Sequence, residues 1–202
     1  MDKLKAGTAA FGVAGAFFLL YPVLRPYSDE TTVEGLRVMG TSAWVASHMF
    51  AVGGFLLVSL GLPVLERSRA AVVTTIGALL TSVYYGAETF GLYPLGLRAA
   101  EDPDPRLLEL VEAVRYQPVG ITIFAIGLIV LAVGGVMAAV ELKSKLAIPY
   151  ALGFALFLPQ FFTAPPGRMA HGLLLLVGCW LVARELWQRR ATSTSESDRR
   201  TR

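Results

Sequence analysis

The chain has 202 residues, of which 54% are hydrophobic and only 16% are charged, and its formal net charge is +3. In soluble domains roughly a quarter of the residues are charged, so this composition argues against a soluble fold and for one domain embedded in lipid. The basic residues are spread over loops and the C-terminal end, which argues against nucleic-acid binding.

Uncharged runs predict six membrane-crossing helices, because each run approaches the roughly 20 residues that cross a hydrocarbon core. In chain order the runs cover about 6–24, 41–65, 70–93, 118–140, 146–163 and 167–187. We expect the first to be a retained helix, because no small-x-small cleavage site follows it. The expected fold is an all-α, polytopic six-helix bundle over 1–190, followed by a disordered cytoplasmic tail over 191–202.

Prolines and arginines modify three of these runs. Pro94 is expected to stop the third helix at Tyr93, and Pro159 to kink the fifth, because proline lacks a backbone donor. In the sixth run, Arg168 and Arg184 must reach towards the interfaces along their apolar stems.

The segment "EDPDPRLLELVEAVRYQP" predicts a short amphipathic helix between the third and fourth runs, lying on the outer surface. Pro105 suits the first helical position, and the apolar residues recur on one face at Leu107, Leu110, Val111 and Val114. We expect this helix to close a loop over the bundle. A lid over a binding site is the alternative.

The fourth run carries a glycine stripe. Gly120, Gly127 and Gly134 recur every seven residues, so a neighbouring backbone can approach them closely. Such glycine-lined faces predict tight helix packing, and they also suit a homo-oligomer.

The basic residues predict the orientation. With the N-terminus inside, most lysines and arginines fall on the inner side and most acids on the outer side, so both termini are expected in the cytoplasm. The abundance of Ala, Gly, Leu and Arg over Ile and Lys resembles the usage of high-GC bacteria, which implies a bacterial plasma membrane.

Polar residues inside the runs predict one layer near the outer ends of the helices. Since a helix rises 1.5 Å per residue, Glu88, His48 and His171 lie roughly 6 to 10 Å below the expected ends. Four further candidates share this layer or lie one helical turn from these three, namely Gln160, Arg168, Tyr84 and Trp44. Whether these side chains converge depends on how the helices pack.

This layer fits an outward-facing site for a small ligand, centred on His48, Glu88 and His171. A metal-dependent membrane enzyme is one alternative, because two imidazoles, a carboxylate and an open water position form a catalytic zinc site. A single b-type haem between the two histidines is another. Six-helix cytochromes of the b561 kind differ, since they carry four ligand histidines for two haems.

Two further readings of Glu88 stay open. In a proton-linked small-molecule transporter, Glu88 would change its protonation state during the cycle. In a purely structural account, Glu88 would pair with Arg168 or with a histidine and fasten two helices together.

Overall fold

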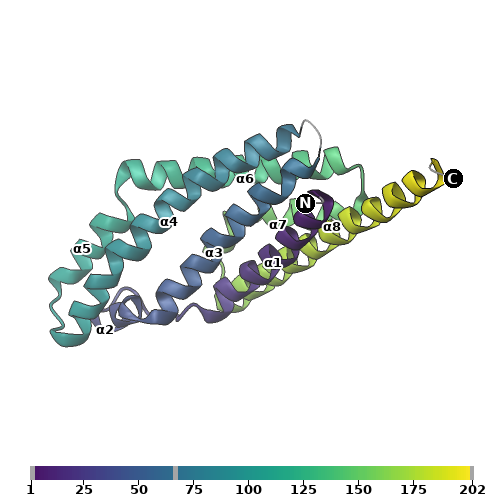
Figure 1. Ribbon diagram of the computed structural model, residues 1–202. Helices are drawn as coiled ribbons and strands as arrows, with labels where there is room; N and C mark the ends of the chain where they lie inside the picture. The colour runs from purple at the N-terminus through teal and green to yellow at the C-terminus, as the bar shows by residue number, and fades with distance from the viewer. Residues whose placement is uncertain (1–2, 66–67, 201–202) are drawn as a thin grey trace.

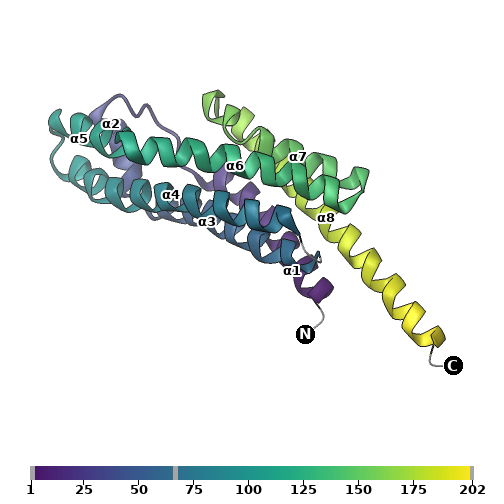
Figure 2. The same ribbon diagram turned by 90° about the horizontal axis from the view of Figure 1, so that it is seen from above.

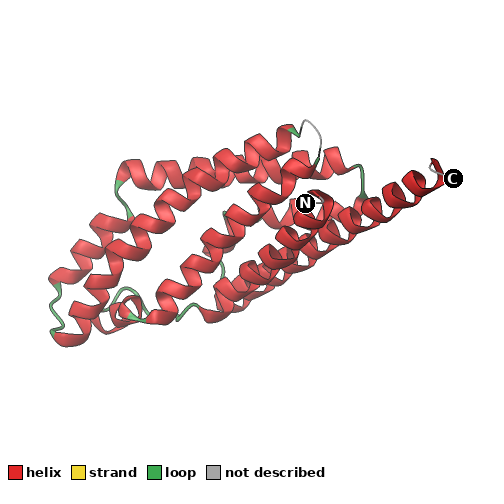
Figure 3. Ribbon diagram, in the orientation of Figure 1, coloured by secondary structure: helices red, strands yellow, loops and turns green. Residues whose placement is uncertain are grey.

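The structure is a computed structural model that describes residues 3–65 and 68–200, with side chains as far as Ala191. Helices joined by loops make up the described part of the chain, which contains no strand (Figure 3). Five helices in it are long and apolar enough to cross a membrane. These are α1 (Lys3–Leu24), α3 (Ser42–Gly61, extended by η2, Leu62–Val64), α4 (Arg69–Glu101), α6 (Pro118–Leu142) and α8 (Pro165–Arg200).

Shorter helices connect these five. They are α2 (Val33–Leu36), η1 (Arg37–Gly40), α5 (Arg106–Arg115), η3 (Lys145–Ala147), α7 (Ile148–Ala155) and η4 (Pro159–Phe162). α2 and α5 gather at one end of the bundle, whereas the start of α1 and the far part of α8 lie towards the other end (Figures 1 and 2). We call the end that carries α2 and α5 the cap end.

Neighbouring long helices run antiparallel. Between α1 and α3, Phe11 meets Gly61 and Phe18 meets Gly54. Between α1 and α8, Gly15 meets Cys179 and Pro22 meets Gly172. Between α4 and α6, Thr74 meets Gly134 and Thr81 meets Gly127. On α4, Gly96 meets Gly40 and Tyr85 meets His48, so α4 also opposes α3. α1 and α4 therefore run towards the cap end, and α3, α6 and α8 run away from it.

The glycine stripe of α6 packs against α4 of the same chain. A methyl group at Gly127 would lie 2.8 Å from the backbone nitrogen of Thr81, and one at Gly134 would lie 3.0 Å from that of Thr74. These two glycines therefore let α6 approach α4, as the spacing predicts. Gly120 faces Tyr84 more loosely, at 3.7 Å.

The expectation that Pro94 ends the third membrane helix is wrong. α4 continues through Pro94 to Glu101, because the extra turns pack against η1 at a glycine pair. A methyl group at Gly40 would lie 2.5 Å from the backbone nitrogen of Leu97, so only glycine permits this approach. This contact holds the α4 extension in place, although proline removes one hydrogen bond.

The α4 extension helps to build a second, smaller core at the cap end. With α2, η1 and α5 it forms the cap, whose buried residues are Leu36, Met39, Trp44, Leu92, Ala99, Leu107 and Val111. Leu107 and Val111 lie on the face of α5 that was expected to be apolar, whereas Leu110 is half exposed. Trp44, from the first turn of α3, joins this core to the bundle.

The fifth predicted helix is divided into three pieces. Within 146–163 the chain forms the end of η3, then α7, then η4, which begins at Pro159, the residue at which a kink is expected. The segment still lies along two long helices: Phe154 packs on Gly135 and Phe161 on Phe124 of α6, while Tyr150 packs on Gly178 of α8. α8 itself continues to Arg200, and the disordered tail over 191–202 stays a prediction.

Candidate functional site

Four charged side chains form a row of ion pairs at the cap end. An Arg25 Nη2 to Glu30 Oε1 pair measures 3.0 Å, Arg115 Nη1 to Glu30 Oε2 measures 2.7 Å, and Arg115 Nε to Glu88 Oε1 measures 3.0 Å. Arg25 and Glu30 belong to the segment after α1, Arg115 ends α5, and Glu88 lies on α4. The row therefore joins three parts of the chain, and its two positive and two negative charges cancel.

The row is largely shielded from solvent. Its side chains are between 9% and 21% exposed. Burial alone would raise the pKa of Glu30, but the charges of Arg25 and Arg115 outweigh it and hold that pKa below its ordinary value. Burial likewise opposes the charge on Arg115, yet Glu88 and Glu30 raise the pKa of that guanidinium. Glu30 and Arg115 therefore stabilise each other in their charged forms.

This geometry corrects the predicted partner of Glu88. Its ion pair is with Arg115, whereas Arg168 donates from Nε to the Thr163 carbonyl at 3.2 Å and from Nη2 to the Phe161 carbonyl at 2.8 Å. Arg168 also lies over the ring of Tyr27, as Arg25 does. Arg168 therefore holds together the turn that precedes α8.

His48 is buried in an aromatic box beside this row. It is 1% exposed, and its ring packs against Trp44 at 4.2 Å, Tyr85 at 5.7 Å and Tyr21 at 5.9 Å between ring centres. Thr41 caps the N-terminus of α3 and so orients the turn that carries Trp44 and His48.

The rim of the box is polar. The Tyr85 hydroxyl donates to the Tyr21 hydroxyl at 3.1 Å, and the Arg25 guanidinium lies 5.1 Å from the Trp44 ring. Tyr84, one turn before Glu88, donates its hydroxyl to the Arg115 carbonyl at 2.8 Å and stacks on Phe124. Trp44 therefore contacts His48, whereas Tyr84 and Glu88 both contact Arg115, and the ion-pair row links these two pairs through Arg25.

The remaining candidates lie in other surroundings. His171 Nε2 donates to the Gly153 carbonyl at 2.8 Å, and the ring packs edge-on against Phe157. Gln160 is buried in η4, where its side-chain nitrogen has no hydrogen-bond partner. The structure shows no direct contact of His171, Gln160 or Arg168 with His48 or Glu88 among the residues it describes.

The expected metal ligands do not form a ligand group. Across residues 3–65 and 68–191, no set of three or more His, Cys, Asp and Glu side chains is placed to hold a metal ion. Both histidines instead use one ring nitrogen on a backbone carbonyl, Trp44 for His48 and Gly153 for His171. The structure therefore gives no support to a zinc site built from His48, Glu88 and His171.

Sequence reasoning missed three members of the row, Arg25, Glu30 and Arg115. One signal for them was present, because an unpartnered acid such as Glu88 needs a nearby cation and α5 ends on an arginine. The fold of the cap decides which arginine reaches Glu88. The pattern of charges along the sequence does not predict that partner.

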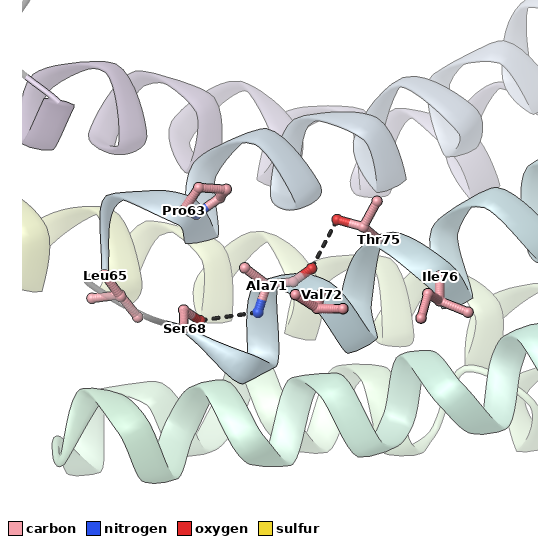
Figure 4. A pocket seen from close by; sticks show the side chains of 7 residues that line it. All are labelled: Pro63, Leu65, Ser68, Ala71, Val72, Thr75 and Ile76. Atoms are coloured by element: carbon pink, nitrogen blue, oxygen red, sulfur yellow. Dashed lines mark hydrogen bonds between the residues drawn. The ribbon is translucent and has the colours of Figure 1, made fainter.

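Two of the surface grooves of the described chain lie at opposite ends of the bundle. One of about 390 Å³ is lined by Tyr84, Val114, Gln117 and other residues of α4, α5 and α6, beside the Arg115–Glu88 pair. Another of about 430 Å³ lies at the opposite end, where Pro63 and Leu65 face the first turns of α4 (Figure 4). The polar groups there, Ser68 and Thr75, hydrogen-bond to the backbone of Ala71, so this second groove offers no converging chemistry.

These features define a class, namely an all-helical protein with several helices compatible with membrane insertion and a buried polar cluster at one end. No protein-family model matches the chain, and comparison with curated proteins and with solved structures also finds no match. The function must therefore be argued from the site itself.

Proposed function

We propose that the protein is an integral plasma-membrane protein that crosses the bilayer six times. α6 and α8 both run away from the cap end, so the chain must return towards that end between them. Residues 145–162 make this return alongside α6 and α8, as the Phe161–Phe124 and Tyr150–Gly178 contacts indicate. One face of this segment packs against those helices, and its exposed face carries the apolar residues Ile148, Leu152, Leu156 and Phe162, as a surface in contact with lipid requires.

The orientation follows from charge. Lys3, Lys5, Lys143, Lys145 and Arg184 all belong to the end opposite the cap, and an excess of basic residues favours the cytoplasmic side. Both termini are therefore proposed to be cytoplasmic. The cap, with the amphipathic helix α5, would then cover the outer face of the bundle.

We further propose that the outward polar cluster around His48 binds a small ligand. One observation carries this: buried polar atoms without a partner gather there, namely Trp44 Nε1, His48 Nε2, Arg25 Nε and Arg115 Nη2. Buried polar groups are normally hydrogen-bonded, and leaving one unpaired costs about 1–3 kcal/mol. A bound polar molecule would remove this cost.

Neither alternative gains comparable support. A metal-dependent enzyme lacks a ligand group among the described residues. In a proton-linked transporter Glu88 would have to exchange protons, but its side chain is engaged by Arg115 Nε at 3.0 Å. Binding without transport therefore accounts best for the arrangement.

The test is ligand-dependent stability of the detergent-purified protein. A panel of neutral, anionic and cationic small molecules is screened for a rise in unfolding temperature, since a ligand at a hundred times its dissociation constant adds about 2.7 kcal/mol. The rise should disappear in His48→Phe and persist in Ser59→Ala, a buried polar position on the same helix but nearer its other end. Binding at this cluster would be refuted if no compound raises the unfolding temperature of the wild type, or if a compound raises that of His48→Phe and Ser59→Ala equally.

A further inference from the structure

The hydrogen bonds of His48 determine which of its nitrogens is free. Nδ1 lies 2.7 Å from the Trp44 carbonyl oxygen, which can only accept, so Nδ1 must carry the hydrogen. In the neutral imidazole Nε2 is then an acceptor with an open lone pair. Nε2 is buried and has no partner, so what is missing beside His48 is a hydrogen-bond donor.

His171 provides a built-in contrast. Its Nε2 lies 2.8 Å from the Gly153 carbonyl, so Nε2 carries the hydrogen there. The two histidines of the chain are therefore expected to be opposite tautomers. Only His48 leaves a buried ring nitrogen without a partner.

The other unpartnered atoms around His48 are donors. Trp44 Nε1 can only donate, and its ring is 4.2 Å from the His48 ring. Arg25 Nε, whose guanidinium lies over the same tryptophan, is also without an acceptor. A complementary molecule must therefore both donate and accept, which a hydroxyl group does.

The charges of the cluster select against ions. Arg25 and Arg115 are each paired with a carboxylate, and Glu30 and Glu88 are each paired with a guanidinium. An anion would meet no uncompensated cation and would lie near two carboxylates, while burying any unpaired charge is costly. The aromatic rings of Tyr21, Trp44 and Tyr85 offer apolar walls for carbon-bound hydrogens.

We propose that the ligand of this site is a neutral, hydroxyl-bearing small molecule, with one hydroxyl donating to His48 Nε2 and one oxygen accepting from Trp44 Nε1. This inference rests on the proposed ligand-binding function, and it adds the chemical class of the ligand and the role of each contact. His48 is a recognition residue in this account, and no bond is made or broken.

The experiment uses the full chain in detergent with ¹⁵N-labelled histidine. Because the chain contains two histidines, two sets of ring signals are expected, and His171→Asn assigns them. Before any ligand is added, His48 should be protonated on Nδ1 and His171 on Nε2. Protonation of His48 on Nε2 in its neutral form would overturn the proposal.

The probes are glycerol, myo-inositol and glucose for the neutral class, and inorganic phosphate and acetate for anions. At millimolar concentration, at least one neutral probe should move the His48 Nε2 signal and leave His171 unchanged. Trp44→Phe, which removes the Nε1 donor and keeps an aromatic ring, should weaken binding of that probe about tenfold, as expected for one lost buried hydrogen bond. His48→Phe controls for the general stabilising effect of polyols, because stabilisation that persists in this variant does not come from the site.

The outcomes separate the two proposals. If an anion shifts His48 and neutral probes do not, the site binds a ligand but its proposed class is wrong. If a neutral probe binds equally well to Trp44→Phe, the assigned contact is wrong. If no probe of either class moves His48 or stabilises the protein, the cluster holds only water and both proposals fail.

Discussion

At the residue scale, Arg115 is the side chain on which the cap-end ion pairs depend. It contacts Glu30 and Glu88 at once and is 14% exposed. Arg115→Met should therefore destabilise the fold by about 3–5 kcal/mol, because it leaves a buried carboxylate without its partner. Equilibrium unfolding in mixed detergent micelles measures this loss.

Arg106 provides the matched control. Its pair with Asp104 measures 2.7 Å but lies in solvent, so Arg106→Met should have little effect. A double change, Arg115→Met with Glu88→Gln, should recover part of the stability, since it removes the charge left uncompensated on α4. Equal effects of Arg115→Met and Arg106→Met would contradict the structural role given to the row.

Glu30 should make the stability of the cap depend on pH. Its pKa in the folded state lies below the ordinary value of 4.5, because the two arginines outweigh the effect of burial. The ionised form thus stabilises the fold above that value, and this contribution disappears as the pH falls through the folded-state pKa. The unfolding temperature should drop on acidification below about pH 4.5, and less steeply in Glu30→Gln.

Glu34, an exposed acid in the nearby short helix α2, is the control for this loss of stability in acid. Glu34→Gln should follow the wild-type curve. A Glu30→Gln protein whose curve coincides with the wild type would show that the ion pairs of Glu30 do not contribute to stability.

Part of the polar cluster could be predicted from single residues in the sequence. Glu88 stands out as the one acid in a long uncharged run, and its helical spacing from Tyr84 places both on one face of the helix. His48 and Trp44 were found in the same way. His171 was grouped with them because depth along a helix is predictable, whereas the direction of a side chain around the helix axis depends on packing.

At the element scale, the α4 extension shows where local rules give way to tertiary contacts. Pro94 predicts a helix end, but the cap supplies a partner for the extra turns at Gly40 and Gly96. A methyl group at Gly96 would collide with the backbone at Met39 and Gly40. The rule that proline ends a helix considers one helix at a time. It therefore cannot predict the contact between Gly40 and Gly96, which are far apart in sequence.

Gly96→Ala should therefore loosen the cap. Forcing a methyl group against backbone atoms costs typically 1–3 kcal/mol, and here it would separate η1 from α4. Hydrogen exchange at 92–101 should increase. Gly86→Ala on the same helix, where a methyl group meets nothing within 4 Å, should be neutral or slightly stabilising. A reversal of this order would disprove the close packing of η1 on α4.

At the scale of the whole molecule, five of the six uncharged runs form long helices that are apolar enough to cross a membrane. The remaining run, 146–163, forms short helices, of which α7 has Pro149 near its start and η4 begins at Pro159. Hydropathy reports the length of an apolar run, whereas the path of the chain is set by the packing of 145–162 between α6 and α8. The shared direction of α6 and α8 therefore indicates that the chain returns to the cap end between them, which the hydropathy of 146–163 alone does not.

Cysteine labelling can decide the number of crossings. The single native cysteine, Cys179, is buried and can be replaced by alanine. Three exposed positions are then tested one at a time, namely Glu101, Lys143 and Ala164. With six crossings, a membrane-impermeant maleimide added to intact cells should label Glu101→Cys and Ala164→Cys, whereas Lys143→Cys should react only after permeabilisation. Labelling of Lys143→Cys and Ala164→Cys from the same side would mean that 145–162 does not cross, which would place the start of α8 and the cap on opposite faces of the membrane.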